Sequence, residues 1–591
     1  MRQFIKFVFA SCLGTILASV VVLGIASLVM GRAVSNASQA KRVSANSILT
    51  LKLNEPIPEQ TNNIDNTSIT DFDISDKLGL LDMVKAIQHA SSDDNIKGIF
   101  LDLNSVAAGQ ASLLTLRRAL ENFKENGKFV IAHATFYTQG SYYLASVANK
   151  VLVNPMGGVD WRGFAAQIPF FKDMLDRLGI KMQIYYAGKF KSATEPYRLN
   201  EMSDENRRQI SEYLEGNYDT FLEGIAASRG IDQSELRRMA DTYAIRNAQD
   251  AVDNKLVDQL AYRDQVYAEI RNRLGLDTDA DIKSIAIGDY SANVKKKIEL
   301  GTKGKIAVVI AEGTIVDGKG TLGSIGGDKY AKIFRKIRKD KSIDAVVLRV
   351  NSGGGSGIAS DVMWRELELI KDSGKPLIVS MGDLAASGGY YIACNADSVF
   401  AEPNTITGSI GVYGMIPSFE KMLEDKVGVT FDAVKTGPFA VGLSPFVDIT
   451  PEEGEIIKVS VKEFYDTFLQ KVADGRGMTV DEVNEVAQGR VWTGKKAVEL
   501  GLVDALGGIE SALAVAAEKA DLSTYRTVEY PKSKSFTEQI LEKISGGGAD
   551  QVLAGQVVKA QLGDLYPYFK YLQEIRDMRG VQARLPFVVS Y

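Results

Sequence analysis

The sequence contains only two cysteines and two histidines among its 591 residues, so it has little of the chemistry that most metal sites need. Cys12 stands in an apolar N-terminal run and Cys394 is alone in the rest of the chain, which excludes an intradomain disulfide and a cysteine zinc site. His89 and His133 have no metal-binding spacing, and any Ser-His-Asp triad would have to use one of them. We interpret both histidines as structural or surface residues.

Neither sign of charge predominates, since 69 Lys and Arg face 74 Asp and Glu for a net charge of −5. No basic block marks a phosphate-binding face, so nucleic acid is not an expected partner. Hydrophobic residues at 45% and charged residues at 24% are ordinary for a folded protein, which argues against wholesale disorder and against a polytopic membrane protein. The length exceeds what one hydrophobic core supports, so we expect several core-sized units.

A long hydrophobic run occurs at the N-terminus, where Phe7–Met30 contains 24 residues without a charge. At a rise of 1.5 Å per residue this run reaches about 36 Å as a helix, enough to cross a hydrocarbon core. The run predicts a transmembrane anchor. A cleaved signal peptide is the alternative, because Ser38-Gln39-Ala40 resembles a cleavage site, although an apolar region of that kind is usually about 7 to 15 residues long. Basic residues flank the run on both sides and leave its orientation open.

The chain is an internal duplication, because two long segments match each other at a nearly constant offset of about 247 residues. The clearest match is Tyr218-Asp-Thr-Phe-Leu222 with Tyr465-Asp-Thr-Phe-Leu469, at an offset of 465 − 218 = 247. In each half, short buried runs alternate with amphipathic stretches, which is the β-α-β rhythm of an α/β domain. We place the linker between the halves near Val294–Gly304.

The expected domain organisation has five parts. They are a cytoplasmic stub with a transmembrane anchor (residues 1–31), a tether (32–45), an N-terminal repeat domain (46–300), a C-terminal repeat domain (301–530) and a helical tail (531–591).

Three loops differ between the halves, and the first is rich in glycine. In the C-terminal half Asn351-Ser-Gly-Gly-Gly-Ser356 follows a strand, and consecutive glycines let backbone N–H groups face a developing anion. The N-terminal half has Val106-Ala107-Ala108 at the same places, where positive φ angles are costly. The sequence therefore predicts an oxyanion loop in the C-terminal half alone.

The second loop presents Ser387 in a turn of small residues between a strand and a helix, which suits a nucleophile. The N-terminal half carries Gln139 at this position, since 387 − 248 = 139. An ordinary helix N-cap is the alternative interpretation of Ser387. The adjoining small residues and the glycine loop favour the nucleophile.

The third loop concerns the base that such a serine needs, for which a lysine is the substitute when histidine is lacking. Lys191 is the best candidate, and the C-terminal half has Phe439 or Gly437 at the equivalent place, depending on a gap. A general-base lysine must be neutral near pH 7, which requires a desolvated site. A solvated or salt-bridged side chain is the common alternative, and we assign Lys189 and Lys435 to that class. Spacing alone does not select Lys191.

Four motifs together resemble the signal peptide peptidase A family, also called protease IV, in its long, duplicated bacterial form. They are Lys191-Ser-Ala-Thr-Glu-Pro196, Arg349-Val-Asn-Ser-Gly-Gly-Gly-Ser356, Ala385-Ala-Ser-Gly-Gly-Tyr390 and Ile406-Thr-Gly-Ser-Ile-Gly411. The resemblance runs from the anchor to about residue 520 and includes the order of the halves. It implies an α/β fold of two tandem, duplicated Clp-protease/crotonase-like domains, each a ββα superhelix, behind an N-terminal transmembrane helix.

The resemblance also implies the site. Ser387 is expected to be the nucleophile and Lys191 the general base of a Ser-Lys dyad, with Ser409 orienting the lysine and the backbone N–H groups of Gly354 and Gly388 forming the oxyanion hole. A turn-capping role is the alternative for Ser409. One departure is that Gly353 stands where the family usually has proline, which makes this loop less constrained.

By the same resemblance, the expected function is a membrane-anchored serine endopeptidase that hydrolyses remnant signal peptides left in the cytoplasmic membrane, without metal, nucleotide or organic cofactor. The expected partners are peptide substrates, the membrane and further copies of the chain in a homotetramer, with the globular part on the periplasmic side. Two alternatives stay open from the sequence, a crotonase-like enzyme acting on acyl-CoA and a membrane-tethered peptide-binding scaffold whose catalytic residues are vestigial.

Overall fold

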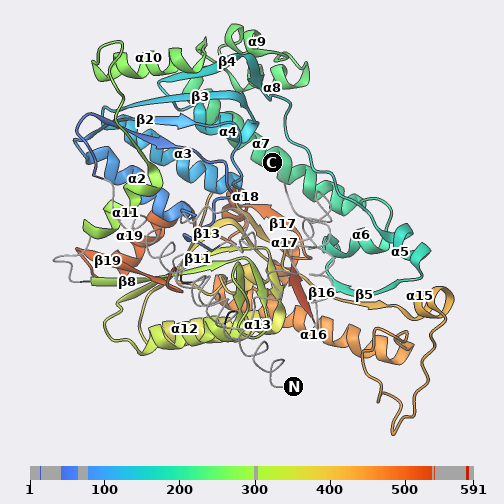
Figure 1. Cartoon of the computed structure of the whole chain (residues 1–591). Coiled ribbons are helices and arrows are strands. Elements are labelled where there is room, and N and C mark those ends of the chain that lie inside the picture. The colour runs from blue at the N-terminus through green and yellow to red at the C-terminus, as the bar shows by residue number, and fades with distance from the viewer. Residues whose placement is uncertain are drawn as a thin grey trace, which may run out of the picture.

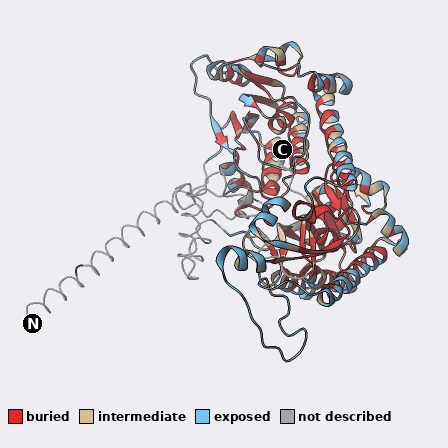
Figure 2. Ribbon diagram, turned by 90° about the vertical axis from the view of Figure 1, so that its right-hand side faces the viewer, coloured by how far each residue is buried: buried red, intermediate tan, exposed pale blue. Residues whose placement is uncertain are grey.

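The computed structural model describes residues 42–63, 77–297, 304–534 and 581–584, together with the isolated positions 14 and 538. It shows two α/β lobes, one from each half of the chain, stacked one above the other in Figure 1. Buried residues are concentrated in the sheets and on the inner faces of the helices of both lobes (Figure 2). The predicted fold class, two tandem α/β repeats, is confirmed.

A six-stranded parallel sheet in the order β6-β4-β3-β2-β1-β7 forms the centre of the N-terminal lobe. Strands buried on both faces are expected of a parallel sheet, and β2 and β3 accordingly contain short apolar runs. The strands are β1 (Ser47–Leu51), β2 (Ile96–Asp102), β3 (Phe129–Tyr137), β4 (Lys150–Val159), β6 (Gln259–Leu260) and β7 (Ser284–Ala286). Helices of this half are α2 (Leu80–Ser92), α3 (Gln110–Glu125), α4 (Gln139–Ala145), α7 (Asp204–Arg229), α8 (Gln233–Asp241), α9 (Ala248–Asp253), α10 (Arg263–Leu274) and α11 (Ile287–Lys297).

The C-terminal lobe repeats this arrangement around an eight-stranded sheet. Its main path is β17-β15-β13-β11-β8-β19, β14 branches from β13, and β18 pairs with β14. Its strands are β8 (Gly304–Glu312), β11 (Ala345–Ser352), β13 (Leu377–Ala386), β14 (Ser398–Ala401), β15 (Ile406–Gly408), β17 (Val491–Thr493), β18 (Ala505–Leu506) and β19 (Tyr525–Tyr530). Its helices are α12 (Gly327–Lys339), α13 (Gly357–Asp372), α14 (Gly388–Tyr391), α15 (Glu420–Met422), the π-helix η2 (Leu423–Val427), α16 (Pro451–Arg476), α17 (Val480–Val486), α18 (Gly494–Glu499) and α19 (Ile509–Lys519).

The longest helices show how exactly the repeat is kept. α7 and α16 begin and end 247 residues apart, since 451 − 204 = 247 and 476 − 229 = 247. Each begins after a hydroxyl N-cap, Ser203 or Thr450, and each ends at a left-handed glycine, Gly230 or Gly477. The offset found in the sequence is therefore a structural repeat.

A third sheet crosses from one half of the chain to the other, in the order β10-β9-β12-β20-β16-β5. Here β5 of the N-terminal half pairs antiparallel along its whole length with β16 of the C-terminal half. Figure 1 shows β5, α5 and α6 beside β16, away from the N-terminal sheet. The members are β5 (Lys181–Ala187), β9 (Thr314–Val316), β10 (Ser324–Gly326), β12 (Gly354–Ser356), β16 (Val412–Ser418) and β20 (Gln582–Arg584), and the short helices next to β5 are α5 (Lys172–Leu178), the 3₁₀ turn η1 (Ser192–Thr194) and α6 (Glu195–Arg198).

The two ends of the chain and the linker are only partly covered by the description. The predicted anchor lies outside the described ranges, as does most of the tail at residues 531–591, of which residues 582–584 form strand β20 rather than helix. None of the helices in the described part of the chain is long and apolar enough to cross a membrane. At the predicted linker, α11 extends past Val294 to Lys297 and β8 begins at Gly304.

Candidate active site

Ser387 lies at the sharp junction between β13 and α14, in a backbone conformation that L-residues rarely adopt. Its φ is 55° and its ψ is −117°, although serine has no special tolerance of a positive φ. Its N–H donates to the Gly408 carbonyl at 2.8 Å, and its side chain makes no capping hydrogen bond to the helix. The structure therefore does not support the N-cap interpretation, and the strain resembles that of a nucleophile turn.

Lys191 reaches the C-terminal lobe because the strand before it, β5, belongs to the crossing sheet. After β5 the chain turns at Gly188, and the N–H of Phe190 donates to the Gln488 carbonyl at 2.8 Å. Gly489 packs so closely that a Cβ on it would lie 2.6 Å from the backbone nitrogen of Lys191. A tight backbone contact between the halves thus holds the lysine loop in place.

The side chains of Lys191, Ser387 and Ser409 meet in a buried cluster. Lys191 Nζ lies 2.8 Å from Ser387 Oγ, 3.0 Å from Ser409 Oγ and 3.1 Å from the Ser409 carbonyl oxygen. Both serines are fully buried, and Lys191 is 1% exposed. Burial lowers the pKa of the Lys191 amine well below its ordinary value, and among the residues that the structure describes no carboxylate counteracts this effect. An uncharged amine at hydrogen-bonding distance from a serine hydroxyl can accept its proton.

Gln209, on α7, clamps the lysine loop and was not singled out in the sequence. Its Nε2 donates to the Phe190 carbonyl at 3.1 Å and to Ser192 Oγ at 2.8 Å, and its Oε1 accepts from the Val491 N–H at 3.2 Å. One buried amide therefore joins both sides of Lys191 to strand β17. A glutamine within a helix carries no sequence signal for such a role.

The glycine loop lies against the beginning of α14. Gly354 and Gly355 have φ angles of 95° and 154°, and a Cβ placed on Gly354 would lie 2.7 Å from the Gly388 nitrogen. These contacts require glycine at position 354. The Gly354 N–H donates to Ser352 Oγ at 3.1 Å, and that hydroxyl donates to the Gly313 carbonyl at 2.7 Å. The structure thus brings both predicted oxyanion glycines next to Ser387, with the Gly354 N–H engaged by Ser352.

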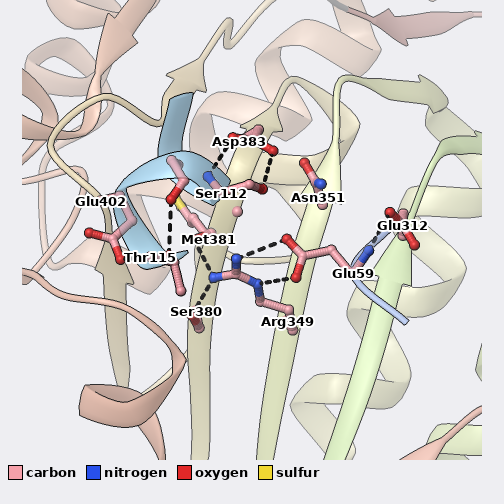
Figure 3. A network of polar contacts seen from close by, with 12 residues as sticks. Glu59, Ser112, Thr115, Glu312, Arg349, Asn351, Ser380, Met381, Asp383 and Glu402 are labelled. Atoms are coloured by element: carbon pink, nitrogen blue, oxygen red, sulfur yellow. Dashed lines mark hydrogen bonds and ion pairs between the residues drawn. The ribbon is translucent and has the colours of Figure 1, made fainter. Parts of the chain in front are cut away.

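Charged residues from both halves form a network across strands β11 and β13, which lead to the glycine loop and to Ser387 (Figure 3). Arg349, on β11, donates from Nε and Nη2 to the two carboxylate oxygens of Glu59 at 3.0 and 2.8 Å, with both side chains 1% exposed. Its Nη1 donates to Ser380 Oγ and to the Met381 carbonyl on β13. The arginine therefore fixes the two strands that lead to the glycine loop and to Ser387. The signal for this role is a lone charge within the apolar run of β11.

Asp383 and Glu402 extend this network to helix α3 of the N-terminal half. The α3 N-cap, Gly109, has no side chain, and Asp383 accepts instead from the Ser112 N–H at 2.9 Å and from Ser112 Oγ at 2.5 Å. Glu402 accepts two hydrogen bonds from Arg118, at 2.7 and 2.8 Å. The strand that carries Ser387 is thereby joined to the opposite half.

Glu312, a partly buried acid, and the two histidines make their contacts away from Ser387 and Lys191. Burial and the nearby charge of Glu59 raise the pKa of Glu312 to about 7, against the hydrogen bonds that it accepts from Asn63 and from the backbone N–H groups of Glu59 and Gln60. His89 Nδ1 lies 2.7 Å from the Tyr290 hydroxyl, and His133 is buried on β3. The interpretation of both histidines as structural residues agrees with these positions.

Comparison with known proteins follows the duplication. The family model of peptidase family S49 matches residues 122–277 and 370–523, one segment in each half. Protease 4 of Salmonella typhi is 38% identical over 484 residues, 80% of this chain and 77% of that protein. Protease 4 of Haemophilus influenzae is 34% identical over 85% of this chain and 84% of that protein. The chloroplastic serine protease SPPA of Arabidopsis thaliana is 31% identical over 92% of this chain and 78% of that protein. The chain therefore belongs to peptidase family S49 and is a serine peptidase.

Proposed function

We propose that the peptidase works through a Ser-Lys dyad divided between the halves, with Ser387 as nucleophile and Lys191 as general base. The observation that carries this proposal is the 2.8 Å approach of Lys191 Nζ to Ser387 Oγ in a buried site where the pKa of the amine is depressed. Neither half contains both groups, so neither half alone is active. No observation favours the acyl-CoA alternative, and the placement of the two groups argues against a vestigial scaffold.

Ser409 is the residue that orients the lysine. A neutral amine has two N–H donors and one lone pair, and the Ser409 carbonyl oxygen, 3.1 Å away, can only accept. When Ser409 Oγ accepts the second N–H, the lone pair is left facing the hydroxyl of Ser387. Ser409 has a φ of 51°, a strained conformation that this double contact explains better than turn capping does.

The reaction is acyl transfer to Ser387. Lys191 takes the hydroxyl proton as Ser387 Oγ attacks a peptide carbonyl, and the protonated amine then gives that proton to the leaving nitrogen. The backbone N–H groups of Gly388 and Gly354 stabilise the oxyanion, and the Gly354 N–H exchanges Ser352 Oγ for the substrate oxygen. Water hydrolyses the ester by the same proton transfers.

The proposed substrates are remnant signal peptides in the cytoplasmic membrane, with the globular part on the periplasmic side. The uncharged run Phe7–Met30, long enough to span a bilayer, supports the anchor, and the resemblance noted above supports the substrate class. The family resemblance supports assembly into a homotetramer, and an exposed arm between η2 and α16, visible in Figure 2 as a pale blue loop, offers a surface for contact between copies. This arm exposes Phe431, Val434 and Phe439, and Val434 is 104% exposed, which is typical of a surface that contacts another subunit.

Peptide hydrolysis across pH 6 to 10 tests the dyad. For the wild type we expect kcat/KM to rise with pH through a single limb below the ordinary lysine range, because the base is active only when neutral and its pKa is lowered. Ser387→Ala and Lys191→Met should each lose about 10⁴-fold or more. The matched control is Lys189→Met, since Lys189 is exposed and two residues away. Full activity in Lys191→Met would make the base assignment wrong.

A further inference from the structure

The lysine loop and strand β17 are joined by one buried amide, the side chain of Gln209 near the beginning of α7. Gln209 is 1% exposed. Its Nε2 donates to the Phe190 carbonyl and to Ser192 Oγ, on either side of Lys191. Its Oε1 accepts from the N–H of Val491 on β17. One end of the amide therefore holds the loop that carries the lysine, and the other end holds a strand of the C-terminal half.

Strand β17 is in turn connected to both serines of the site through backbone contacts. In its antiparallel pairing with β15, Val491 lies opposite Gly408. The Gly408 carbonyl accepts from the Ser387 N–H at 2.8 Å. The Arg490 carbonyl, one residue before Val491, accepts from the Ser409 N–H at 2.7 Å. The amide that holds the lysine loop therefore also holds the backbone that positions the nucleophile.

A buried carboxylate fixes the orientation of this amide. Glu195 is 1% exposed, and its Oε2 accepts from Asn206 Nδ2 at 2.8 Å. Because a carboxylate can only accept, Asn206 turns its amino group to Glu195 and its Oδ1 to Gln209 Nε2, 3.1 Å away. The Oε1 of Gln209 is then left to face Val491. These residues in series thus determine which end of the amide faces each half.

The repeat shows that the fold does not require a buried amide at this position. The equivalent residue in α16 is Ile456, since 456 − 209 = 247, and its side chain is 57% exposed. An exposed apolar side chain is therefore compatible with the same helix. The buried polar contacts of Gln209 arise where α7 lies against the other half of the chain, which is where the dyad is assembled.

We propose that Gln209 is a positioning residue of the dyad, which sets the place of Lys191 relative to Ser387 across the junction of the halves. Glu195 and Asn206 contribute by fixing the orientation of its amide. The proposal rests on the proposed function of Ser387 and Lys191. Proton transfer needs the amine within hydrogen-bonding distance of the hydroxyl, and a misplacement of about 1 Å can cost about 10²-fold in rate.

Labelling of Ser387 in the full chain with a fluorophosphonate, followed by mass spectrometry across pH 6 to 10, separates positioning from folding. The final extent of labelling counts the folded sites, whereas the rate and its pH dependence report on the base. Gln209→Met removes the hydrogen bonds, and we expect the rate to fall by about 10- to 10²-fold at full extent. The basic limb should move to higher pH, because an amine displaced from the buried cluster is better hydrated and its pKa rises toward the ordinary value.

Two further variants accompany this one. Arg207→Met is the matched control, since Arg207 is exposed on the same helix, and its labelling rate should stay within about twofold of the wild type. Glu195→Gln can present either an oxygen or an amino group to Asn206, so it should move the limb in the same direction by a smaller amount. A wild-type rate, or a reduced extent with a wild-type pH profile, in Gln209→Met overturns the proposal. If Gln209→Met does not fold, a wild-type limb in Glu195→Gln overturns it instead.

Failure of the dyad itself gives a different result. If Lys191→Met is labelled at the wild-type rate, the base assignment is wrong and the role of Gln209 falls with it. If Lys191→Met is not labelled while Gln209→Met behaves as the wild type, the dyad stands and Gln209 is a structural residue only.

Discussion

The helix that follows the third core strand begins differently in the two halves of the molecule. In the N-terminal half, Thr138 has an ordinary φ of −72° and caps α4, and Gln139 uses its amide to hold Gly163 through two hydrogen bonds of 3.0 Å. In the C-terminal half, Ser387 has a φ of 55° and caps nothing. The same strand-to-helix scaffold is therefore relaxed in one half and strained in the other, so the strain is not a requirement of the fold. It accompanies the residues to which we assign chemistry.

The other two equivalent positions repeat this contrast. Ser409, strained and bonded to Lys191, corresponds to Trp161, whose ring is buried and whose Nε1 donates to the Leu236 carbonyl at 2.9 Å. Gly354, with its positive φ, corresponds to the exposed residue Ala107, since 354 − 247 = 107. At these positions the N-terminal half therefore has packing residues in place of site residues. It still supplies the lysine loop that completes the site of the C-terminal half.

The largest effect on kcat/KM should come from moving the serine from position 387 to the equivalent position 139 of the other half. We expect the double variant Gln139→Ser, Ser387→Ala to be as inactive as Ser387→Ala alone, at a loss of roughly 10⁵- to 10⁶-fold in kcat/KM, because position 139 lacks the strained turn and its half has Val106-Ala107-Ala108 in place of the glycine loop. Gln139→Ser alone should keep activity within about twofold. Peptide hydrolysis measured for the three variants decides the matter. Activity of the double variant above that of Ser387→Ala would show that the N-terminal half retains a usable site.

The next largest difference should lie in how much two equivalent ion pairs, one in each half, contribute to the free energy of unfolding. Arg349 and Asp102 are related by the repeat, since 349 − 102 = 247, but Arg349 with Glu59 is 1% exposed, whereas Asp102 and its partner Arg263 are 19% and 38% exposed. Arg349→Met leaves a buried carboxylate unpaired and should lower the free energy of unfolding by about 3–5 kcal/mol. Asp102→Asn should cost about 1 kcal/mol or less. Urea denaturation of both variants measures the difference.

A double variant tests whether the loss of stability comes from the unpaired charge. Glu59→Leu with Arg349→Met removes both charges and should regain much of the lost stability, because the cost lies in the unpaired charge rather than in the absent pair. If Arg349→Met and Asp102→Asn cost the same amount, the burial of the Arg349 pair has no energetic consequence and the contrast between the halves is wrong at this position.

The sequence predicted the repeat well, because a constant offset of about 247 residues needs no knowledge of tertiary contacts. It also predicted which loops differ, and the contrast of Ser387 with Gln139 follows directly from aligning the halves. The pairing of Lys191 with Ser387 came from the family resemblance, since the two residues are 196 positions apart and no local pattern joins them. The tertiary contact that unites them is the pairing of β5 with β16, and a strand's own sequence does not determine which sheet edge it joins.

Other features of the site lay beyond a sequence argument for similar reasons. Glu59 lies outside the regular elements, 290 residues before Arg349, so only the lone charge in an apolar strand indicated that Arg349 needs a partner. Strand β20 has three residues, too few for any periodic pattern, and its place is determined by the strands on either side of it. Asp383 caps a helix that belongs to the other half, where capping rules applied along the chain cannot find it.

Substitutions at Gly354 and at its equivalent, Ala107, should also distinguish the two halves, with the smallest of the effects predicted here. Gly354→Ala places a methyl group 2.7 Å from the Gly388 nitrogen of the proposed oxyanion hole and strains a backbone with a φ of 95°, so kcat/KM should fall by about 10²- to 10³-fold. The reverse change at the equivalent position, Ala107→Gly, should leave kcat/KM within about twofold, because that loop is exposed and faces no nucleophile. Thermal denaturation of both variants separates local strain from loss of the fold. Equal activity in the two variants would mean that the positive φ of Gly354 serves the fold and not the reaction, and that the Gly354 N–H is not part of the oxyanion hole.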